Sequence, residues 1–260
     1  MNILHCQGFL SHALHKRFTV DFFIPDRLDA CTNFLMMNDG QMSNDLQLST
    51  TLSRFEQEGL NIFTASIHAS AERIQEYGVR SWPDYRKRGA RAWEYEKFIT
   101  TELFPFIRSS FKFNYQPERS VYAGYSLGAL SAFDIVWENP NLFSKLGAFS
   151  GSFWWRSQAF NSDNPDGHRI MHQKIEQSTK KEGVKFWFQA GTEDEKSDRN
   201  NNGVIDVIDD INDLMHRLQL LGYDPNQDMY FHEMHGGRHE PQTWAEALPV
   251  FLNWAFKDKF

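Results

Sequence analysis

The sequence predicts an α/β fold in which a mostly parallel central sheet carries helices on both faces. Short apolar runs suited to buried strands alternate along the chain with longer segments of helical period, and this alternation is typical of parallel sheets. No internal repeat, low-complexity tract or Pro/Gly/Ser-rich linker divides the 260 residues. We therefore expect a single domain over residues 1–260, a length at which α/β folds still form one unit.

Strands are expected at Phe18–Ile24, Cys31–Met37, Leu60–Ile67, Ser120–Ala123, Lys145–Phe149, Val184–Gln189 and Met229–Glu233. Helices are expected at Ala92–Ser109, Leu127–Trp137, His168–Thr179, Val207–Leu221 and Thr243–Phe256. The polar, irregular segment 69–91 is expected to form a loop or cap over the functional site. Ligands bind at the carboxyl ends of parallel strands, so functional residues should lie in the loops directly after the strands.

Composition and charge exclude several classes of protein. Hydrophobic residues make up 41% of the chain, with 23 Phe and 8 Trp, so a packed core is expected and disorder is not. The net charge of −7 argues against nucleic-acid binding, because such domains normally present a basic face. Cys6 and Cys31 match no zinc or redox spacing. Neither a membrane-spanning run nor a signal peptide is recognisable, so we expect a cytoplasmic protein without a membrane partner.

A G-x-S-x-G motif runs from Gly124 to Gly128 and places Ser126 between an apolar strand and a helical pattern. A nucleophile on such a strand-to-helix turn has strained backbone angles, and flanking glycines let neighbouring segments approach closely. The turn also leaves the hydroxyl at the amino end of a helix, where backbone N–H groups favour negative charge. Ser126 is therefore the predicted nucleophile, and an ordinary turn with a serine near the helix start is the alternative.

A serine nucleophile needs a base, and a third group that orients the base. His239 follows the strand Met229–Glu233, and the glycine pair before it allows a tight loop toward Ser126. His239 is the predicted base, and His235 in the same loop is the local competitor. The chain order of serine, acid and histidine then matches that of enzymes with this motif.

The strand Val184–Gln189 leads into three consecutive carboxylates that are candidates for the acid. Asp194 is favoured because it is a short acid three residues past a turn glycine. Glu193 and Glu195 remain alternatives, since their chemistry is the same and only one of the three side chains can point at His239.

Acyl transfer also needs donors for the oxyanion, one from the residue after the nucleophile and one from the loop after an early strand. The backbone amides of Leu127 and Gln41 are the predicted donors. Tyr125, Trp154 and Trp155 are candidates for lining the substrate pocket. Two adjacent tryptophans in an extended segment cannot both point inward, so we expect at least one of them in the core or at the rim.

The segment Asp198–Asp209 has the pattern D-x-N-x-N-G-x-I-D-x-x-D, which resembles an EF-hand-type calcium loop. The expected ligands are the side chains of Asp198, Asn200, Asn202, Asp206 and Asp209 and the carbonyl of Val204. Asp209 stands where Glu is usual, and a polar Asn/Asp/Gly turn is the alternative. We expect a structural Ca²⁺ that orders the loop beside Asp194, and no cofactor for the chemistry.

Together these segments resemble the Putative esterase family of the α/β-hydrolases, which includes esterase D-like, feruloyl and enterochelin-esterase-like enzymes. The resemblance is carried by Met37–Gln41, Ala123–Leu130, Gly191–Glu195 and Gly236–His239. Trp244 looks like the family's ending, and Arg73–Tyr77 is similar to a variable loop bordering the site there. The resemblance implies an α/β-hydrolase fold and places the family's serine on Ser126, its acid on Asp194 and its histidine on His239.

The predicted function is therefore a serine esterase that cleaves a small-molecule carboxylic ester through an acyl-enzyme intermediate. Within enzymes, the alternative is another acyl transfer by an acyltransferase or a peptidase. Outside enzymes, the alternative is a binding protein that kept the α/β-hydrolase fold without catalysis, because fold alone does not fix function.

Overall fold

In the computed structural model, which describes residues 1–257, the strands form one eight-stranded sheet in the order β1-β2-β4-β3-β5-β6-β7-β8. The strands are β1 (Asn2–Ser11), β2 (Lys16–Ile24), β3 (Asn33–Asn38), β4 (Ile62–Ile67), β5 (Ser120–Tyr125), β6 (Lys145–Phe149), β7 (Lys185–Gly191) and β8 (Met229–Met234). β1 pairs with β2, and β2 with β4, in antiparallel fashion, whereas the remaining pairs are parallel.

The interior strands are apolar because both of their faces are covered, as is usual for parallel sheets. Every residue of β3, β4 and β5 is buried. The register aligns the carboxyl ends of the strands, since Tyr125 of β5 pairs with Phe149 of β6, which pairs with Gln189 of β7. The loops that follow β5, β6, β7 and β8 therefore meet at one edge of the sheet.

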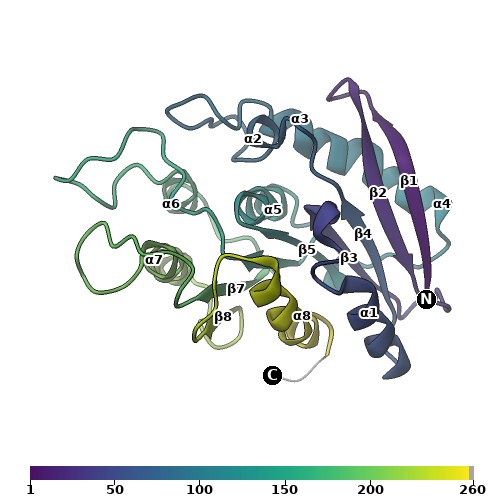
Figure 1. Cartoon of the computed structure of the whole chain (residues 1–260). Coiled ribbons are helices and arrows are strands. Elements are labelled where there is room, and N and C mark those ends of the chain that lie inside the picture. The colour runs from purple at the N-terminus through teal and green to yellow at the C-terminus, as the bar shows by residue number, and fades with distance from the viewer. Residues whose placement is uncertain (258–260) are drawn as a thin grey trace.

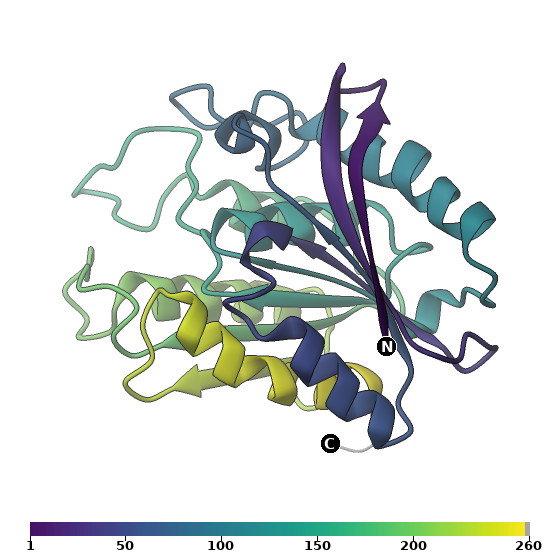
Figure 2. The ribbon, with the colours of Figure 1, turned by 45° about the vertical axis from the view of Figure 1, so that its right-hand side comes forward.

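Helices cover both faces of the sheet (Figures 1 and 2). One face packs α1 (Leu48–Gln57) and α8 (Pro241–Phe256) against sheet residues such as Leu35, Val121 and Trp187. The other face is covered by α3 (Ala92–Lys97), the π-helical segment η2 (Phe98–Leu103), α4 (Phe104–Ser110), α5 (Leu127–Glu138), α6 (Ile170–Glu176) and α7 (Asp206–Leu220). Short helical turns occur at η1 (Gly40–Met42), α2 (Arg73–Glu76) and η3 (Pro117–Arg119).

The predicted α/β class with helices on both faces is confirmed. Each expected strand and helix overlaps one or more elements; the bounds of β6 agree with the expectation, and the others differ at one or both ends. β1 and α1 were not predicted from the sequence. Helix α1 carries the helical spacing Leu48, Leu52 and Phe55, all buried, so its signal was present. β1 is an edge strand with mostly exposed residues, and its apolar pattern is correspondingly weak.

The segment 69–91 is mostly irregular and is firmly packed. Tyr77 and Val79 are buried in the core, and the Arg80 amide donates to the Asp134 carboxylate at 2.7 Å. Among residues 1–257, no helix is long and apolar enough to cross a membrane.

Candidate active site

Ser126 lies between the last residue of β5 and the first residue of α5, and its φ and ψ are 54° and −122°. A non-glycine residue in that region of backbone space is strained by about 1–3 kcal/mol, so the surrounding structure must hold it there. The Ser126 amide donates to the Phe149 carbonyl at 2.9 Å, and its carbonyl accepts from the Ser152 amide at 3.1 Å. These bonds fix a sharp turn that leaves the Ser126 side chain partly exposed between buried neighbours.

The two glycines of the motif are required by close backbone approach. A Cβ atom on Gly124 would lie 2.3 Å from the carbonyl oxygen of Gly128, the second residue of α5. A Cβ atom on Gly128 would lie 2.3 Å from Oδ2 of Asp39, in the loop after β3. The motif therefore packs the nucleophile turn against its own helix and against the Asp39 loop.

His239 is held by Asp194 across the loops that follow β8 and β7. His239 Nδ1 and Asp194 Oδ1 are 2.7 Å apart, and the Asp194 side chain is 1% exposed against 42% for His239. The two loops are tied together because the Glu193 amide donates to the Gly237 carbonyl at 2.8 Å. With Nδ1 engaged by the carboxylate, Nε2 of His239 is the nitrogen left for proton transfer.

The buried Asp194 carboxylate has three further supports. Its Oδ2 accepts from the Ser150 hydroxyl at 2.7 Å and from the Gly191 amide at 3.1 Å. The Trp244 indole N–H donates in turn to Ser150 Oγ at 2.9 Å, and the Trp244 ring meets the His239 ring edge to face at 5.3 Å. Ser150 was not predicted as a site residue, although its place directly after β6 was an available signal.

The other two carboxylates have different surroundings. Glu193 is exposed and pairs with Arg238 at 3.1 Å, with both side chains more than half exposed. Glu195 lines the cavity in front of Ser126, and burial together with the nearby Asp206 raises its pKa above the usual value. The competing His235 is exposed in the loop before Gly236.

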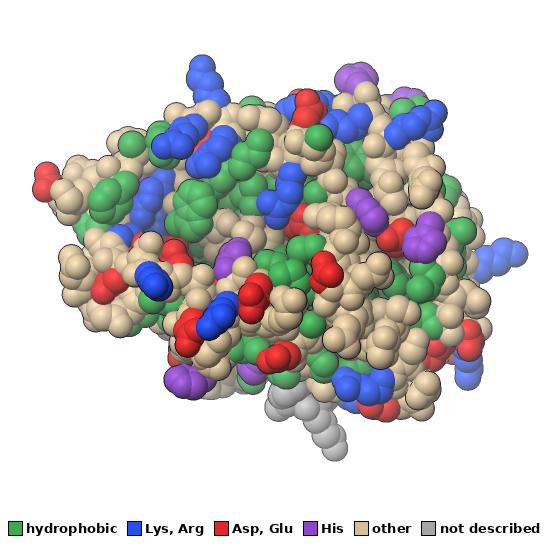
Figure 3. Space-filling view, in the orientation of Figure 1, with side chains coloured by type: hydrophobic (Ala, Val, Ile, Leu, Met, Phe, Trp, Pro, Cys, Tyr) green, Lys and Arg blue, Asp and Glu red, His purple; other side chains and the backbone are tan. Residues whose placement is uncertain are grey.

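Ser126, Asp194 and His239 line one open cavity of about 280 Å³. Trp154 and Val207 contribute its apolar wall, and Trp154 is 40% exposed. In this cavity the Ser126 hydroxyl lies 3.4 Å from the Ser152 hydroxyl. Hydrogen bonds between a serine nucleophile and its histidine base often form fully only when substrate is bound. On the face seen in Figure 3, acidic and basic side chains are interspersed, and hydrophobic side chains surface between them.

Two of the predicted pocket residues lie elsewhere. The Tyr125 ring is fully buried below the turn, where it packs against Phe149 at 4.8 Å and Trp244 at 5.1 Å. Trp155 is 1% exposed and packs under segment 69–91, with its ring 4.6 Å from the Arg88 guanidinium. The expectation that Tyr125 and Trp155 line the pocket is therefore wrong, because their strand and loop positions direct both rings into the core.

The predicted oxyanion donors occupy the first turns of two helices. Leu127 is the first residue of α5 and Gln41 the second residue of η1, and amides at helix starts have no partner within the helix. The η1 loop is anchored by Asp39, whose buried carboxylate receives Arg73 Nε at 2.6 Å and Nη2 at 2.8 Å. Arg73 Nη2 also lies 3.3 Å from the carbonyl of Tyr125, so it connects this loop to the nucleophile turn.

The loop predicted to bind calcium has the expected sharp bend. Gly203 has a φ of +86°, and the Asp198 carboxylate accepts from the amides of Asn202 at 3.1 Å and Gly203 at 2.9 Å. The side-chain amide nitrogens of Asn200 and Asn202 face Asp209, at 2.8 Å and 3.2 Å. N–H groups of both side chains therefore point at Asp209, whereas a Ca²⁺ ion would need their oxygens as ligands.

Arg199 supplies the positive charge at this loop. Its guanidinium lies 3.3 Å from Asp206, 3.6 Å from Asp209 and 2.8 Å from Asp210. Within residues 1–257, no group of three or more His, Cys, Asp or Glu side chains is placed to hold a metal ion. In this arrangement the side chains do not fit a Ca²⁺ ion, and the structure gives the calcium prediction no support.

Sequence comparisons match most of the chain to one family. The model of the family described as "Putative esterase" matches residues 11–255. "Uncharacterized protein YbbA" of Bacillus subtilis (strain 168) is 26% identical over 129 residues, which are 47% of this chain and 51% of YbbA. The matched part thus spans about half the length of that curated relative.

Comparisons with solved structures extend over the whole fold. An enterochelin esterase from Shigella flexneri has a TM-score of 0.76 at 17% identity, covering 99% of this chain and 59% of the enterochelin esterase. A ferulic acid esterase has a TM-score of 0.71 at 15% identity and covers 98% of both chains. An IroE-like serine hydrolase from Shewanella oneidensis has a TM-score of 0.70 at 17% identity, covering 99% of this chain and 81% of the hydrolase. These similarities confirm the α/β-hydrolase fold predicted from the sequence.

Proposed function

Because this chain belongs to the Putative esterase family, we propose that it hydrolyses carboxylic esters through an acyl-enzyme intermediate on Ser126. The observation that carries the proposal is the pairing of a strained Ser126 turn with a His239–Asp194 hydrogen bond of 2.7 Å in one cavity. A strained strand-to-helix serine and a carboxylate-oriented histidine are the two parts that nucleophilic acyl transfer requires.

In the acylation step, Nε2 of His239 removes the proton from Ser126 Oγ as the oxygen bonds to the ester carbonyl carbon. The carbonyl oxygen gains the negative charge, which the amides of Leu127 and Gln41 stabilise. His239 then donates its proton to the leaving alcohol oxygen as the ester C–O bond breaks. Asp194 holds the Nδ1–H tautomer and stabilises the transient imidazolium.

Deacylation repeats the same chemistry with water. His239 removes a proton from the water as its oxygen attacks the acyl carbon, and the oxyanion again lies at the two amides. His239 returns the proton to Ser126 Oγ as the bond between Oγ and the acyl carbon breaks, and the carboxylic acid leaves. Neither step draws on a cofactor, because the proton acceptor and the charge stabilisation both come from this chain.

The open cavity and its apolar wall support a small-molecule ester as the substrate. Trp154 and Val207 offer apolar contact in the cavity that Ser126 lines, and Glu195 adds a carboxyl group to the same lining. An acyltransferase or peptidase would use the same residues. The comparison of p-nitrophenyl acetate with the matching p-nitroanilide separates ester hydrolysis from peptidase activity. Hydrolysis of the ester and not of the anilide is the expected result.

The direct test replaces the nucleophile. Ser126→Ala should lower hydrolysis of p-nitrophenyl acetate by at least about 10³-fold, since loss of a triad nucleophile leaves only residual catalysis. Ser131→Ala is the matched control, because Ser131 is a buried serine on the same helix, α5. Turnover retained by Ser126→Ala would place the nucleophile elsewhere, and a wild-type protein that does not react with a fluorophosphonate probe would favour the non-catalytic alternative.

Calcium binding at Asp198–Asp209 stays a prediction that rests on the sequence pattern. For Ca²⁺ to bind, the Asn200 and Asn202 amides would have to rotate so that their side-chain oxygens face the ion in place of the nitrogens that now face Asp209. A ligand at about 100 times its Kd stabilises the folded state by about 2.7 kcal/mol, which corresponds to a rise in Tm of about 5–10 °C at this chain length. An unchanged Tm between excess Ca²⁺ and chelator would end the calcium hypothesis.

A further inference from the structure

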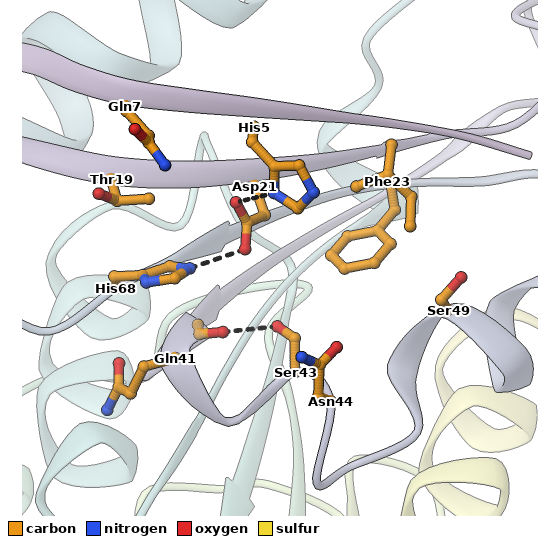
Figure 4. Close-up of a pocket in the computed structure, with 12 residues that line it drawn as sticks. His5, Gln7, Thr19, Asp21, Phe23, Gln41, Ser43, Asn44, Ser49 and His68 are labelled. Atoms are coloured by element: carbon orange, nitrogen blue, oxygen red, sulfur yellow. Dashed lines mark hydrogen bonds and ion pairs between the residues drawn. The ribbon is translucent and has the colours of Figure 1, made fainter.

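A second cavity, of about 330 Å³, lies beside the η1 loop on the face of the β1–β2 hairpin. Figure 4 shows its polar groups: two imidazoles flank the carboxylate of Asp21, and the loop that carries Gln41 and Ser43 lies below them. Of these residues, the proposed reaction uses Gln41 alone. The cavity therefore contains an ionisable cluster that adjoins the oxyanion-binding loop.

The cluster is centred on Asp21 of β2, whose side chain is 8% exposed. Asp21 Oδ1 lies 2.8 Å from Nδ1 of His5, and Oδ2 lies 2.7 Å from Nε2 of His68. A buried carboxylate requires donors, so each imidazole carries its proton on the nitrogen that faces Asp21. Both ring orientations are thereby fixed, although the His5 side chain is 64% exposed and that of His68 only 30%.

His68 is in direct contact with the loop. It follows the last residue of β4, and its amide donates to the carbonyl of Thr19 at 3.0 Å. A Cβ atom on Gly40 would lie 2.9 Å from Cδ2 of the His68 ring and 2.7 Å from the carbonyl oxygen of Ser66. The Gly40 backbone thus lies directly against the imidazole. The Gly40 carbonyl accepts a hydrogen bond from the Ser43 hydroxyl at 2.7 Å.

The N–H of Gln41 belongs to the peptide group that joins Gly40 to Gln41, so its position follows that of Gly40. The Gln41 side chain is fixed to the same strand end, because its Oε1 accepts from the amide of Ala69 at 2.9 Å. Its Nε2 lies 3.3 Å from Asp39 Oδ1. Gly40, on one side of this peptide group, therefore contacts His68, and Gln41, on the other side, bonds to Ala69, the residue after His68.

We propose that His68, oriented by Asp21, is a positioning residue that sets the Gln41 amide for oxyanion binding; this inference rests on the proposed esterase reaction. The substrate does not reach His68 in this account, and the effect passes through the contact with Gly40. Loss of one oxyanion donor costs about 10²–10³-fold in kcat. A displaced donor should cost less, so His68→Ala should lower kcat by about 10- to 100-fold.

The experiment compares three variants on p-nitrophenyl acetate, with rates expressed per active site titrated by a fluorophosphonate. His68→Ala should lower kcat while KM stays within about threefold, because the contact matters in the transition state. It should also weaken inhibition by phenylboronic acid, whose adduct with serine places an oxygen near the oxyanion site, by about tenfold. His68→Gln, whose side-chain amide can donate to Asp21, should recover most of the lost kcat.

His5→Ala is the matched control, since His5 bonds to the same carboxylate from β1, whereas the ring against Gly40 is that of His68; its kcat should change by less than about twofold. If His68→Ala lowers only Tm and the titrated fraction, with kcat per site unchanged, the role is structural and the proposal is overturned. Equal losses of kcat in His68→Ala and His5→Ala would overturn it as well. A wild-type protein without esterase activity would overturn the proposed function together with this inference.

Discussion

Asp194→Asn is the substitution that most sharply tests the site, because three adjacent carboxylates allow a comparison within one turn of chain. Asp194 is 1% exposed and lies 2.7 Å from His239 Nδ1. Its replacement by Asn preserves the shape and removes the charge. The side-chain amide can also donate to Nδ1, which shifts the proton to Nε2 and leaves His239 unable to accept the Ser126 proton.

The size of the loss follows from the geometry. A carboxylate and an imidazolium about 4 Å apart between charge centres attract each other by about 4 kcal/mol at an effective dielectric constant of about 20. That energy corresponds to about 10³-fold in rate, and the wrong tautomer adds to it. We therefore expect kcat to fall by about 10³- to 10⁴-fold in Asp194→Asn.

The assay measures kcat and KM on p-nitrophenyl acetate for Glu193→Gln, Asp194→Asn and Glu195→Gln, with Tm as the check on folding. Glu193→Gln removes only an exposed ion pair with Arg238, so its kcat should stay within about threefold. Glu195→Gln should change KM more than kcat, because Glu195 lines the cavity. A full loss in either glutamine variant, with an active Asp194→Asn, would refute this reading of the site.

Three further predictions concern the surroundings of the site and the core. Ser150→Ala removes the hydroxyl that donates to Asp194 at 2.7 Å, so kcat should fall by about tenfold and the free energy of unfolding by about 1–3 kcal/mol; an unchanged kcat would contradict this role. Gly128→Ala forces a Cβ to within 2.3 Å of Asp39 Oδ2, so we expect a lower Tm and a displaced η1 loop, seen as a kcat loss at permissive temperature. Burial holds the pKa of His172 well below its usual value, so the unfolded state takes up a proton first as the pH falls. The free energy of unfolding of the wild type should therefore drop by up to about 1.4 kcal/mol per pH unit below about pH 6.5. Denaturant unfolding of His172→Gln should show a smaller drop, and parallel curves of unfolding free energy against pH for the two proteins would disprove this.

Much of the fold could be predicted from the sequence because the interior strands are buried on both faces. Lys145–Phe149 was predicted to the residue, and the other interior strands differ only at their ends. The apolar sequence pattern that marks a strand was weak where the chain is exposed. β1 lies at the sheet edge with Leu4 and Leu10 more than 40% exposed, so little in its composition marks it as a strand.

The parts of the site that depend on local chain geometry were predictable. Ser126 follows β5 directly, between Gly124 and Gly128, whereas His239 and Asp194 lie a few residues past the ends of β8 and β7, after Gly237 and Gly191. The supports of the site come from side chains distant in sequence. Ser150 and Trp244 are 94 residues apart, and only the aligned ends of β6 and β7 and the start of α8 bring them to Asp194.

Pocket lining was predicted less well because it depends on which way a side chain turns. Tyr125 and Trp155 are next to Ser126 and Trp154 in sequence, yet both point into the core. Tyr125 is the last residue of the buried strand β5, whereas Ser126 lies on the turn after it. The sequence predicted that at least one of the two adjacent tryptophans lies in the core or at the rim, but not which of them lines the pocket.

The central claim is a covalent intermediate on Ser126, and intact-protein mass spectrometry tests it most directly. The wild-type protein should gain the mass of one fluorophosphonate-derived phosphonyl group, and peptide mapping should place that group on Ser126. Ser126→Ala should gain none under the same conditions, whereas Ser131→Ala should be labelled like the wild type. A phosphonyl group on another residue, or equal labelling of Ser126→Ala, would contradict the account.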